Sequence, residues 1–240
     1  MFIGHFALGY AAKRWVPQLS LGVLFAAPVF ADLVWPVLVA AGIERVRIAP
    51  GITAATPLEF ISYPYSHSLA MLIVWGVLFG WVCARGIPLR VPSGRPEHES
   101  RDAGVALVAA ASARRVFIIT FGLVVSHWVL DYITHIPDMP VYPGGPKYGL
   151  GLWNSVVGTF AVEIAMFAIG VWIYARSTRA RDRVGTWAFV GVTGFLLIGF
   201  IANAGGTPPP SVTALWAMAL ALGALTLVVA WWADKHRMSR

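Results

Sequence analysis

The sequence of 240 residues contains few charged side chains and a single cysteine. Only 12% of the residues are Asp, Glu, Lys or Arg, whereas soluble domains carry roughly 25%, and this difference excludes an ordinary soluble domain. Cys83 is the only cysteine, which excludes an internal disulfide. A cleavable signal peptide is not expected, because Lys13 and Arg14 follow the first apolar segment instead of preceding it.

Long apolar segments dominate the chain instead. Hydrophobic residues make up 58% of it, and several runs reach the roughly 20 residues that cross a hydrocarbon core of about 30 Å. We predict an all-α fold, a polytopic membrane bundle of about six spans preceded by a short half-helix over residues 2–12. The predicted spans cover 19–42, interrupted by Pro28 and Pro36, then 66–85, 105–135, 150–175, 187–204 and 212–233. Residues 1–165 are expected to carry any functional site, and 166–240 add further helices to the same integral domain.

Lysine and arginine are distributed unevenly between the loops. They collect in 85–104, in 176–183 and in the tail from 235, whereas the loops 136–149 and 206–210 contain only Lys147. This asymmetry predicts that the basic loops and the C-terminus are cytoplasmic, with a minor exception at Arg45 and Arg47 in the predicted extramembrane loop 44–65. Because the basic residues behind the net charge of +7 lie in short loops between spans, they indicate topology and not a nucleic-acid-binding patch. Membrane lipids are the expected partners of such a bundle.

Seven ionisable residues lie within apolar segments, where a charged group costs roughly 2.5–3.5 kcal/mol. They are His5, Asp32, His67, His127, Asp131, His135 and Glu163. From a helical rise of about 1.5 Å per residue, all of them fall in the outer half of the bilayer or near its middle, and none at the cytoplasmic side. The shared depth favours a single site, although His5 could also be an interfacial side chain. His98 and His236 lie in basic segments and are expected at the surface.

The stretch SHWVLDYITH, residues 126–135, contains three of these groups. At 100° per residue, positions 127, 131 and 135 form one stripe of a helix. A His and an Asp four residues apart can bring an imidazole nitrogen and a carboxylate oxygen to one cation, so His127 and Asp131 are the predicted metal pair. His135 is about 12 Å from His127 along the axis, too far to share an ion. It is expected at the mouth of the site, where it binds a second ion, a substrate anion or nothing.

Structural interpretations of the same residues stay open. His127 and Asp131 could form a buried hydrogen-bonded pair, and Asp32 could cap backbone N–H groups at the proline kink. His67, in the middle of an SHS sequence, could be an interfacial side chain beside a helix N-cap. Glu163 could be a protonated carboxyl group bonded to a neighbouring helix.

These elements resemble the bacterial inner-membrane YdjM-like proteins, a family of metal-dependent hydrolases. The resemblance rests on the early His5, on Pro28 followed by Asp32, on YSHSL at 65–69 and on SHWVLDYIT at 126–134 ahead of a Pro/Gly loop. Order and approximate spacing agree over residues 1–165, while 166–240 match only as further spans.

The chain departs from the family pattern at two of its elements. Where the family has PDID, the sequence reads FADLV and keeps Asp32 alone. Where the family has HRGxTHS, SYPY stands in place of the first half, so that its first histidine is missing. His135 and Asp138 are additional to the pattern, and the role of Asp138 is not assigned.

The resemblance implies a zinc-type site that hydrolyses a phosphoester of a lipid or lipid-linked substrate at the outer leaflet of the inner membrane. The residues expected to bind this divalent metal are His5, Asp32, His67, His127 and Asp131. Glu163 or His135 is expected to act as general acid or base. The alternatives are a non-enzymatic transporter or scaffold, in which the same groups relay protons or carry an ion, and a family member without metal.

Overall fold

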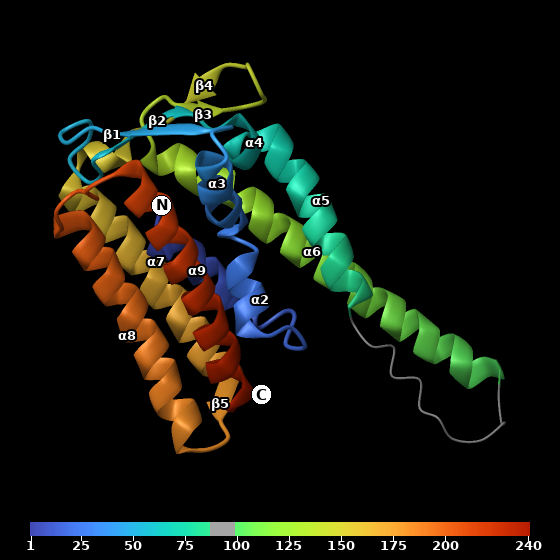
Figure 1. Cartoon of the computed structure of the whole chain (residues 1–240). Coiled ribbons are helices and arrows are strands. Elements are labelled where there is room, and N and C mark those ends of the chain that lie inside the picture. The colour runs from blue at the N-terminus through green and yellow to red at the C-terminus, as the bar shows by residue number, and fades with distance from the viewer. Residues whose placement is uncertain (87–98) are drawn as a thin grey trace.

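The computed structural model describes residues 1–86 and 99–240 (Figure 1). Helices make up most of it, which confirms the all-α prediction. They are α1 (Ile3–Ala12), α2 (Leu21–Ala26), α3 (Phe30–Ala40), α4 (Pro64–His67), α5 (Leu69–Arg85), α6 (Glu99–Thr134), α7 (Val156–Ser177), α8 (Arg183–Gly205) and α9 (Val212–Lys235). A 3₁₀ turn, η1 (Leu152–Asn154), leads into α7.

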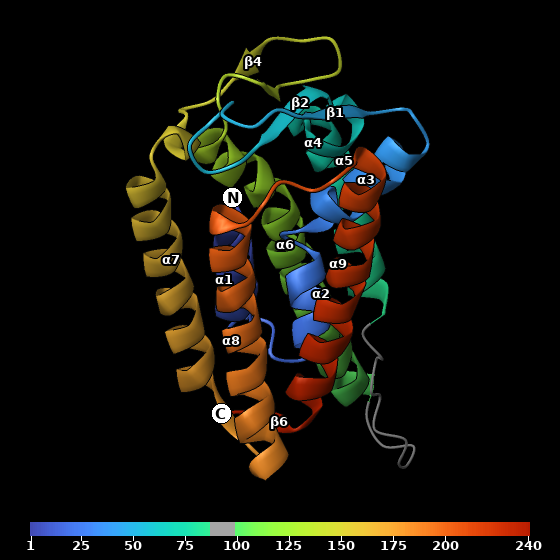
Figure 2. The same cartoon turned by 60° about the vertical axis from the view of Figure 1, so that its left-hand side comes forward.

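Short antiparallel strands pair at the two ends of the bundle. The pairs are β1 (Arg45–Ile48) with β2 (Leu58–Ser62), β3 (Met139–Pro140) with β4 (Lys147–Tyr148), and β5 (Thr178–Ala180) with β6 (Arg237–Ser239). The first two pairs cover one end of the bundle, and the third lies at the other end (Figures 1 and 2). The predicted loop 44–65 therefore contains a hairpin.

Several helices begin at a polar residue whose side chain caps the first turn. Each of these side chains accepts a hydrogen bond from the backbone N–H three residues further on, which satisfies a donor that has no partner within the helix. The capping residues are Ser20 for α2, Ser68 for α5, Ser155 for α7, Asp182 for α8 and Ser211 for α9. The proposed role of the SHS sequence as a helix N-cap is thus confirmed for Ser68.

The segment predicted as the first span is divided into α2 and α3. Pro28 lies in the break between them, where its ring excludes a regular helix, as predicted. Pro36 was expected to interrupt the helix as well, and this expectation is wrong, since α3 continues through it to Ala40. Trp35 and Val39 on the same helix are buried in a core cluster, and we infer that their packing holds the turn around Pro36 together.

Among the described residues, four helices are long and apolar enough to cross a membrane: Val108–Thr134 within α6, all of α7, Arg183–Asn203 of α8, and all of α9. The other two predicted spans correspond to the broken pair α2 and α3 and to α5, whose apolar helices are shorter. The structure thus supports a helical membrane protein. The basic loop predicted at 85–104 falls largely on residues 87–98, which lie outside the described residues. His98, expected at the surface, is one of them.

The helix α1 lies inside the bundle, between α7, α2 and α6 (Figure 2). Most of its residues are buried, as the absence of a polar face in its sequence requires. Its contact with α7 is close because Gly170 has no side chain, and a Cβ there would overlap the backbone of Ala7. Small residues allow helices to approach in this way where the surrounding lipid is as apolar as the protein.

A buried ion pair lies at the end of the bundle that carries β5 and β6. Lys13 Nζ is 2.6 Å from Asp234 Oδ2, and the Tyr174 hydroxyl donates to Asp234 Oδ1 at 2.7 Å. These two buried residues are not among the seven ionisable residues that the sequence places within apolar segments. Lys13 and Asp234 stand at helix ends beside other charged residues, where a solvated position is the ordinary expectation.

We expect Gly170→Ala to destabilise the protein, because the added methyl group would lie 2.7 Å from Ala7 Cα, and overpacking costs about 1–3 kcal/mol. Gly194→Ala in α8 is the matched control, since a Cβ there meets nothing within 4 Å and alanine favours a helix by about 1 kcal/mol. Thermal unfolding in detergent should show a lower melting temperature for the first variant only. Equal melting temperatures for Gly170→Ala and the wild type would contradict the close contact.

Candidate metal centre

The carboxylate of Asp131, near the C-terminal end of α6, is the centre of a cluster of imidazoles. Its side chain is buried, with a residue exposure of 2%. The histidine nitrogens around it are His5 Nε2 at 3.0 Å from Oδ1, and His127, His135 and His67 Nε2 at 3.0, 3.5 and 4.0 Å from Oδ2. Asp32 lies beside His67 and His127. All five residues that the sequence predicts as metal ligands therefore lie together, and His135 lies with them.

The orientation of His127 is set by the break between α2 and α3. Its Nδ1 lies 2.8 Å from the carbonyl oxygen of Pro28, and a carbonyl can only accept, so Nδ1 carries the proton of the neutral ring. Nε2 then presents a lone pair. It lies 3.0 Å from Asp131 Oδ2 and 3.9 Å from Asp32 Oδ1, yet it makes no hydrogen bond among the described residues. At 3.0 Å the two side chains are also close enough for an ion pair between a protonated His127 and Asp131, so the buried pair stays an alternative to metal ligation.

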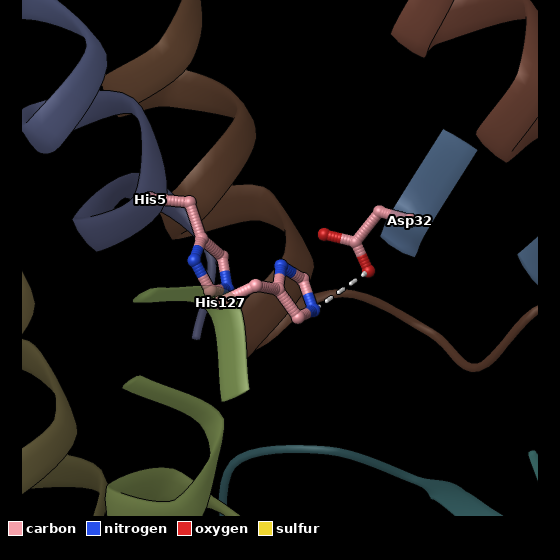
Figure 3. Close-up of side chains that lie close together, drawn as sticks. All are labelled: His5, Asp32 and His127. Carbon is pink, nitrogen blue, oxygen red and sulfur yellow. Dashed lines mark ion pairs between the residues drawn. The ribbon is translucent and has the colours of Figure 1, made fainter. Parts of the chain in front are cut away.

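The imidazole of His5 stacks on that of His127 (Figure 3). The ring centroids are 4.1 Å apart and the planes differ by 5°. Two positive charges at this separation would repel each other in a buried place, so the two rings are not both protonated. His5 Nδ1 is buried and has no hydrogen-bond partner among the described residues.

Asp32 and His67 close the other side of the cluster. His67 Nε2 is 3.6 Å from Asp32 Oδ1, and Figure 3 shows Asp32 turned toward His127 from α3. The Asp32 side chain is 46% exposed, whereas that of His67 is only 3% exposed. The cluster therefore opens beside Asp32. No cap by the Asp32 side chain occurs among the hydrogen bonds of the described residues.

His135 belongs to the cluster and not to a separate mouth. Its Nε2 lies 3.5 Å from Asp131 Oδ2, the oxygen that His127 Nε2 approaches to 3.0 Å. The sets of three donor atoms that lie within 4.8 Å of one another do not include His135, so the expectation that His127 and His135 do not share an ion stays a prediction. His135 directly follows the last residue of α6, Thr134. Its Nδ1 donates to Asp138 Oδ1 at 2.9 Å.

Tyr63 forms a hydrogen bond with the carboxylate of Asp138. Its hydroxyl donates to Asp138 Oδ1 at 2.7 Å. Burial, reinforced by the neighbouring negative charge of Asp138, raises the pKa of the Tyr63 phenol well above its usual range, so that it stays a donor. A carboxylate behind a ligating histidine fixes the tautomer and orientation of the ring. The role that the sequence leaves open for Asp138 is thus to hold His135.

Glu163 lies behind the cluster. Its Oε2 accepts hydrogen bonds from the backbone N–H groups of Phe2 at 2.8 Å and Gly4 at 3.2 Å. A carboxylate at the start of a helix stabilises the unpartnered N–H groups and the positive end of the helix dipole. The geometry thus matches the expectation that Glu163 is bonded to a neighbouring helix, while its protonation is not tested by these contacts, and Glu163 holds the helix that carries His5.

A positive group already lies at one oxygen of Asp131. The amino group of Met1 is buried there, contacts Asp131 Oδ1 and donates to Thr134 Oγ1 at 3.1 Å. Oδ2 is the oxygen that faces His67, His127 and His135. The cluster therefore divides into an Oδ1 side, beside α1, and an Oδ2 side.

The spacing of the donor atoms fits a small divalent cation. Zinc bonds of about 2.0–2.2 Å to nitrogen and oxygen in a tetrahedral site place neighbouring donors roughly 3.3 Å apart. The distances from the imidazole nitrogens of His67 and His127 to the carboxylate oxygens of Asp32 and Asp131 range from 3.0 to 4.0 Å. Two sets of three donor atoms lie within 4.8 Å of one another, and both include His127: His5, Asp32 and His127, and His67, His127 and Asp131.

Three buried partners of the cluster were missed in the sequence: Glu44, Tyr63 and Ser66. Glu44 and Tyr63 lie in a segment that reads as a polar loop, and Ser66 reads as part of a helix cap. Their spacing follows no helical or strand period relative to the histidines, so no pattern marks them.

No family model, curated protein or solved structure matches the chain.

We expect the purified protein to bind divalent metal, and Asp131→Asn to lose most of it, because the variant removes a negative charge that faces at least three imidazole nitrogens. His236→Ala is the control, since His236 is partly exposed and pairs with Asp182 away from the cluster. Elemental analysis of detergent-purified protein measures the difference. Equal metal in Asp131→Asn and the wild type would rule out ligation by Asp131.

Proposed function

We propose that this protein is a membrane-embedded, metal-dependent hydrolase that acts on a phosphoester of a lipid or lipid-linked substrate. The observation that carries the proposal is the position of His127. Its Nδ1 lies 2.8 Å from the Pro28 carbonyl oxygen, so in the neutral ring the lone pair of Nε2 faces Asp131 Oδ2 at 3.0 Å and Asp32 Oδ1 at 3.9 Å. In that state the lone pair and the carboxylate oxygens repel each other, and a buried polar atom without a partner costs about 1–3 kcal/mol. A cation removes both penalties, and imidazole with carboxylate is a donor set typical of zinc.

His127, Asp131, Asp32 and His67 would hold this metal on the Oδ2 side, with His5 beside them. When bound, the ion supplies Lewis acidity toward a phosphoryl oxygen and a water activated near neutral pH. His135 keeps its Nδ1 proton directed at Asp138, so its Nε2 is the atom that accepts or returns a proton within the site. Glu163 positions α1 in this proposal, and we do not assign it a proton-transfer role.

The membrane context favours a lipid substrate. The cluster lies near the end of the bundle covered by β1–β4 and opens beside Asp32, whose helix packs against the apolar helix α9. We propose that α5 and the broken pair of α2 and α3 complete about six membrane segments. A phosphate head group at the interface could then reach the cluster while its chains stay in the bilayer.

The orientation follows from the basic residues. Those of the α7–α8 connection and of the tail after α9 lie at the end opposite to β1–β4 (Figure 1). By the excess of Lys and Arg in cytoplasmic loops, we propose a bacterial inner-membrane protein whose C-terminus is cytoplasmic and whose cluster faces the periplasmic side.

A proton or ion pathway through the bundle has less support. The second buried charge cluster, Lys13 with Asp234, lies near the other end of α1. Between the two clusters, Phe6 and Phe25 pack edge to face with centroids 5.0 Å apart. This apolar contact lies between the two charged groups, so the residues that the structure describes give no support to a continuous polar route along α1.

We expect detergent-solubilised protein to release phosphate or a phosphorylated head group from phospholipid substrates. Chelation should abolish turnover and added zinc should restore it, while Asp131→Asn should reduce turnover by orders of magnitude, because hydrolysis depends on the bound ion. His236→Ala should retain wild-type activity. Stoichiometric metal without hydrolysis of any phosphomonoester or phosphodiester would favour a transporter or scaffold instead.

A further inference from the structure

Glu44 is a buried carboxylate that lies outside the ligand cluster. It follows α3, is 1% exposed and receives three hydrogen bonds. Oε1 accepts from the backbone N–H groups of Tyr65 at 2.8 Å and Ser66 at 2.9 Å, and Oε2 accepts from the Ser66 hydroxyl at 2.6 Å. Three converging donors satisfy an ionised carboxylate, which can only accept.

The Ser66 hydroxyl connects Glu44 to His67 and determines which ring nitrogen of His67 carries the proton. It has a single proton, and that proton is directed at Glu44. His67 Nδ1 lies 2.7 Å from the same hydroxyl oxygen, so this nitrogen must be the donor. The neutral ring of His67 then has its proton at Nδ1 and its lone pair at Nε2, which lies 3.6 Å from Asp32 Oδ1 and 4.0 Å from Asp131 Oδ2.

We propose that Glu44 is a positioning residue that sets the tautomer of His67 through the Ser66 hydroxyl and so directs the Nε2 lone pair at the cation. The proposal rests on the metal site proposed above. In the neutral ring of His127, the Pro28 carbonyl keeps the proton at Nδ1. Glu44, through Ser66, would keep the proton of His67 at Nδ1 in the same way, from a different segment of the chain. Outer partners of this kind change metal affinity by about 10–100-fold when they are removed.

The variant Glu44→Gln separates this role from simple packing, because it keeps the shape of the side chain. The amide oxygen must take the two backbone N–H groups, since an amide NH₂ there would face two donors. The NH₂ group then faces the Ser66 hydroxyl and donates to it. Ser66 turns its own proton to His67 Nδ1, and the proton of the imidazole moves to Nε2, where it blocks the ligand position.

The first measurement is the tautomer of His67 in metal-free protein, read from ¹⁵N chemical shifts of labelled histidine and assigned with His67→Gln. We expect Nδ1–H in the wild type and Nε2–H in Glu44→Gln. The same tautomer in both proteins would overturn the proposal. This readout does not depend on metal, so it decides the role of Glu44 even if the wild type binds no zinc and the proposed function fails.

The second measurement is zinc affinity by competition with a chromophoric chelator. We expect about 10–100-fold weaker binding in Glu44→Gln, with the melting temperature of the metal-free protein close to that of the wild type. Glu59→Gln is the matched control, because Glu59 lies on the neighbouring hairpin and pairs with the exposed Arg47, and its affinity should not change. An unchanged affinity in Glu44→Gln would contradict the relay.

Ser66→Ala provides a second variant in case Glu44→Gln fails to fold. It removes the hydroxyl between Glu44 and His67, so His67 Nδ1 loses its acceptor and the tautomer is no longer determined. We expect a mixture of both tautomers in the ¹⁵N spectrum and weaker zinc binding. A pure Nδ1–H form with wild-type affinity would overturn the proposal.

Discussion

The arrangement of the helices around the polar cluster depends on the buried carboxylate of Asp131. Asp131 is 2% exposed, and an isolated ionised carboxylate in an apolar interior costs far more than a domain's net stability. The Met1 amino group contacts its Oδ1, and imidazole nitrogens of His5, His127 and His135 lie within 3.5 Å of its two oxygens. Because these partners come from α1, α6 and the segment after α6, the charge of Asp131 ties distant parts of the chain to one place.

Irregular backbone makes this arrangement possible. Asp32 stands in the first turn of α3, His67 ends α4, and His135 follows the end of α6. In a membrane, non-helical backbone is tolerated only where protein or a polar cavity satisfies it. At the break between α2 and α3, the carbonyl group of Pro28 accepts a hydrogen bond from His127. The helix breaks and the polar cluster therefore depend on each other.

Two further carboxylates hold parts of the chain that carry the histidines. Asp138 binds His135, and Glu163 holds the first turn of α1 on which His5 stands. Asp138 can only accept, so the proton of the neutral His135 ring lies at Nδ1. Glu163 acts on the backbone of α1 and so places the ring of His5, whose Nδ1 has no hydrogen-bond partner among the described residues.

Much of the architecture follows from the sequence alone, because apolar length, proline and loop charge act locally. These features predicted the helical class, the break at Pro28 and the closeness of His127 to Asp131. Tertiary structure alone decided that His135 joins the cluster, that Glu163 holds a helix, and that Lys13 pairs with Asp234. These outcomes depend on where helix ends meet in space and on which hydrogen bonds remain for each buried group. The spacing of residues along the sequence shows neither the meeting of helix ends nor these hydrogen bonds. The rise per residue gives the depth of a residue along a helix axis and not the direction in which its side chain points.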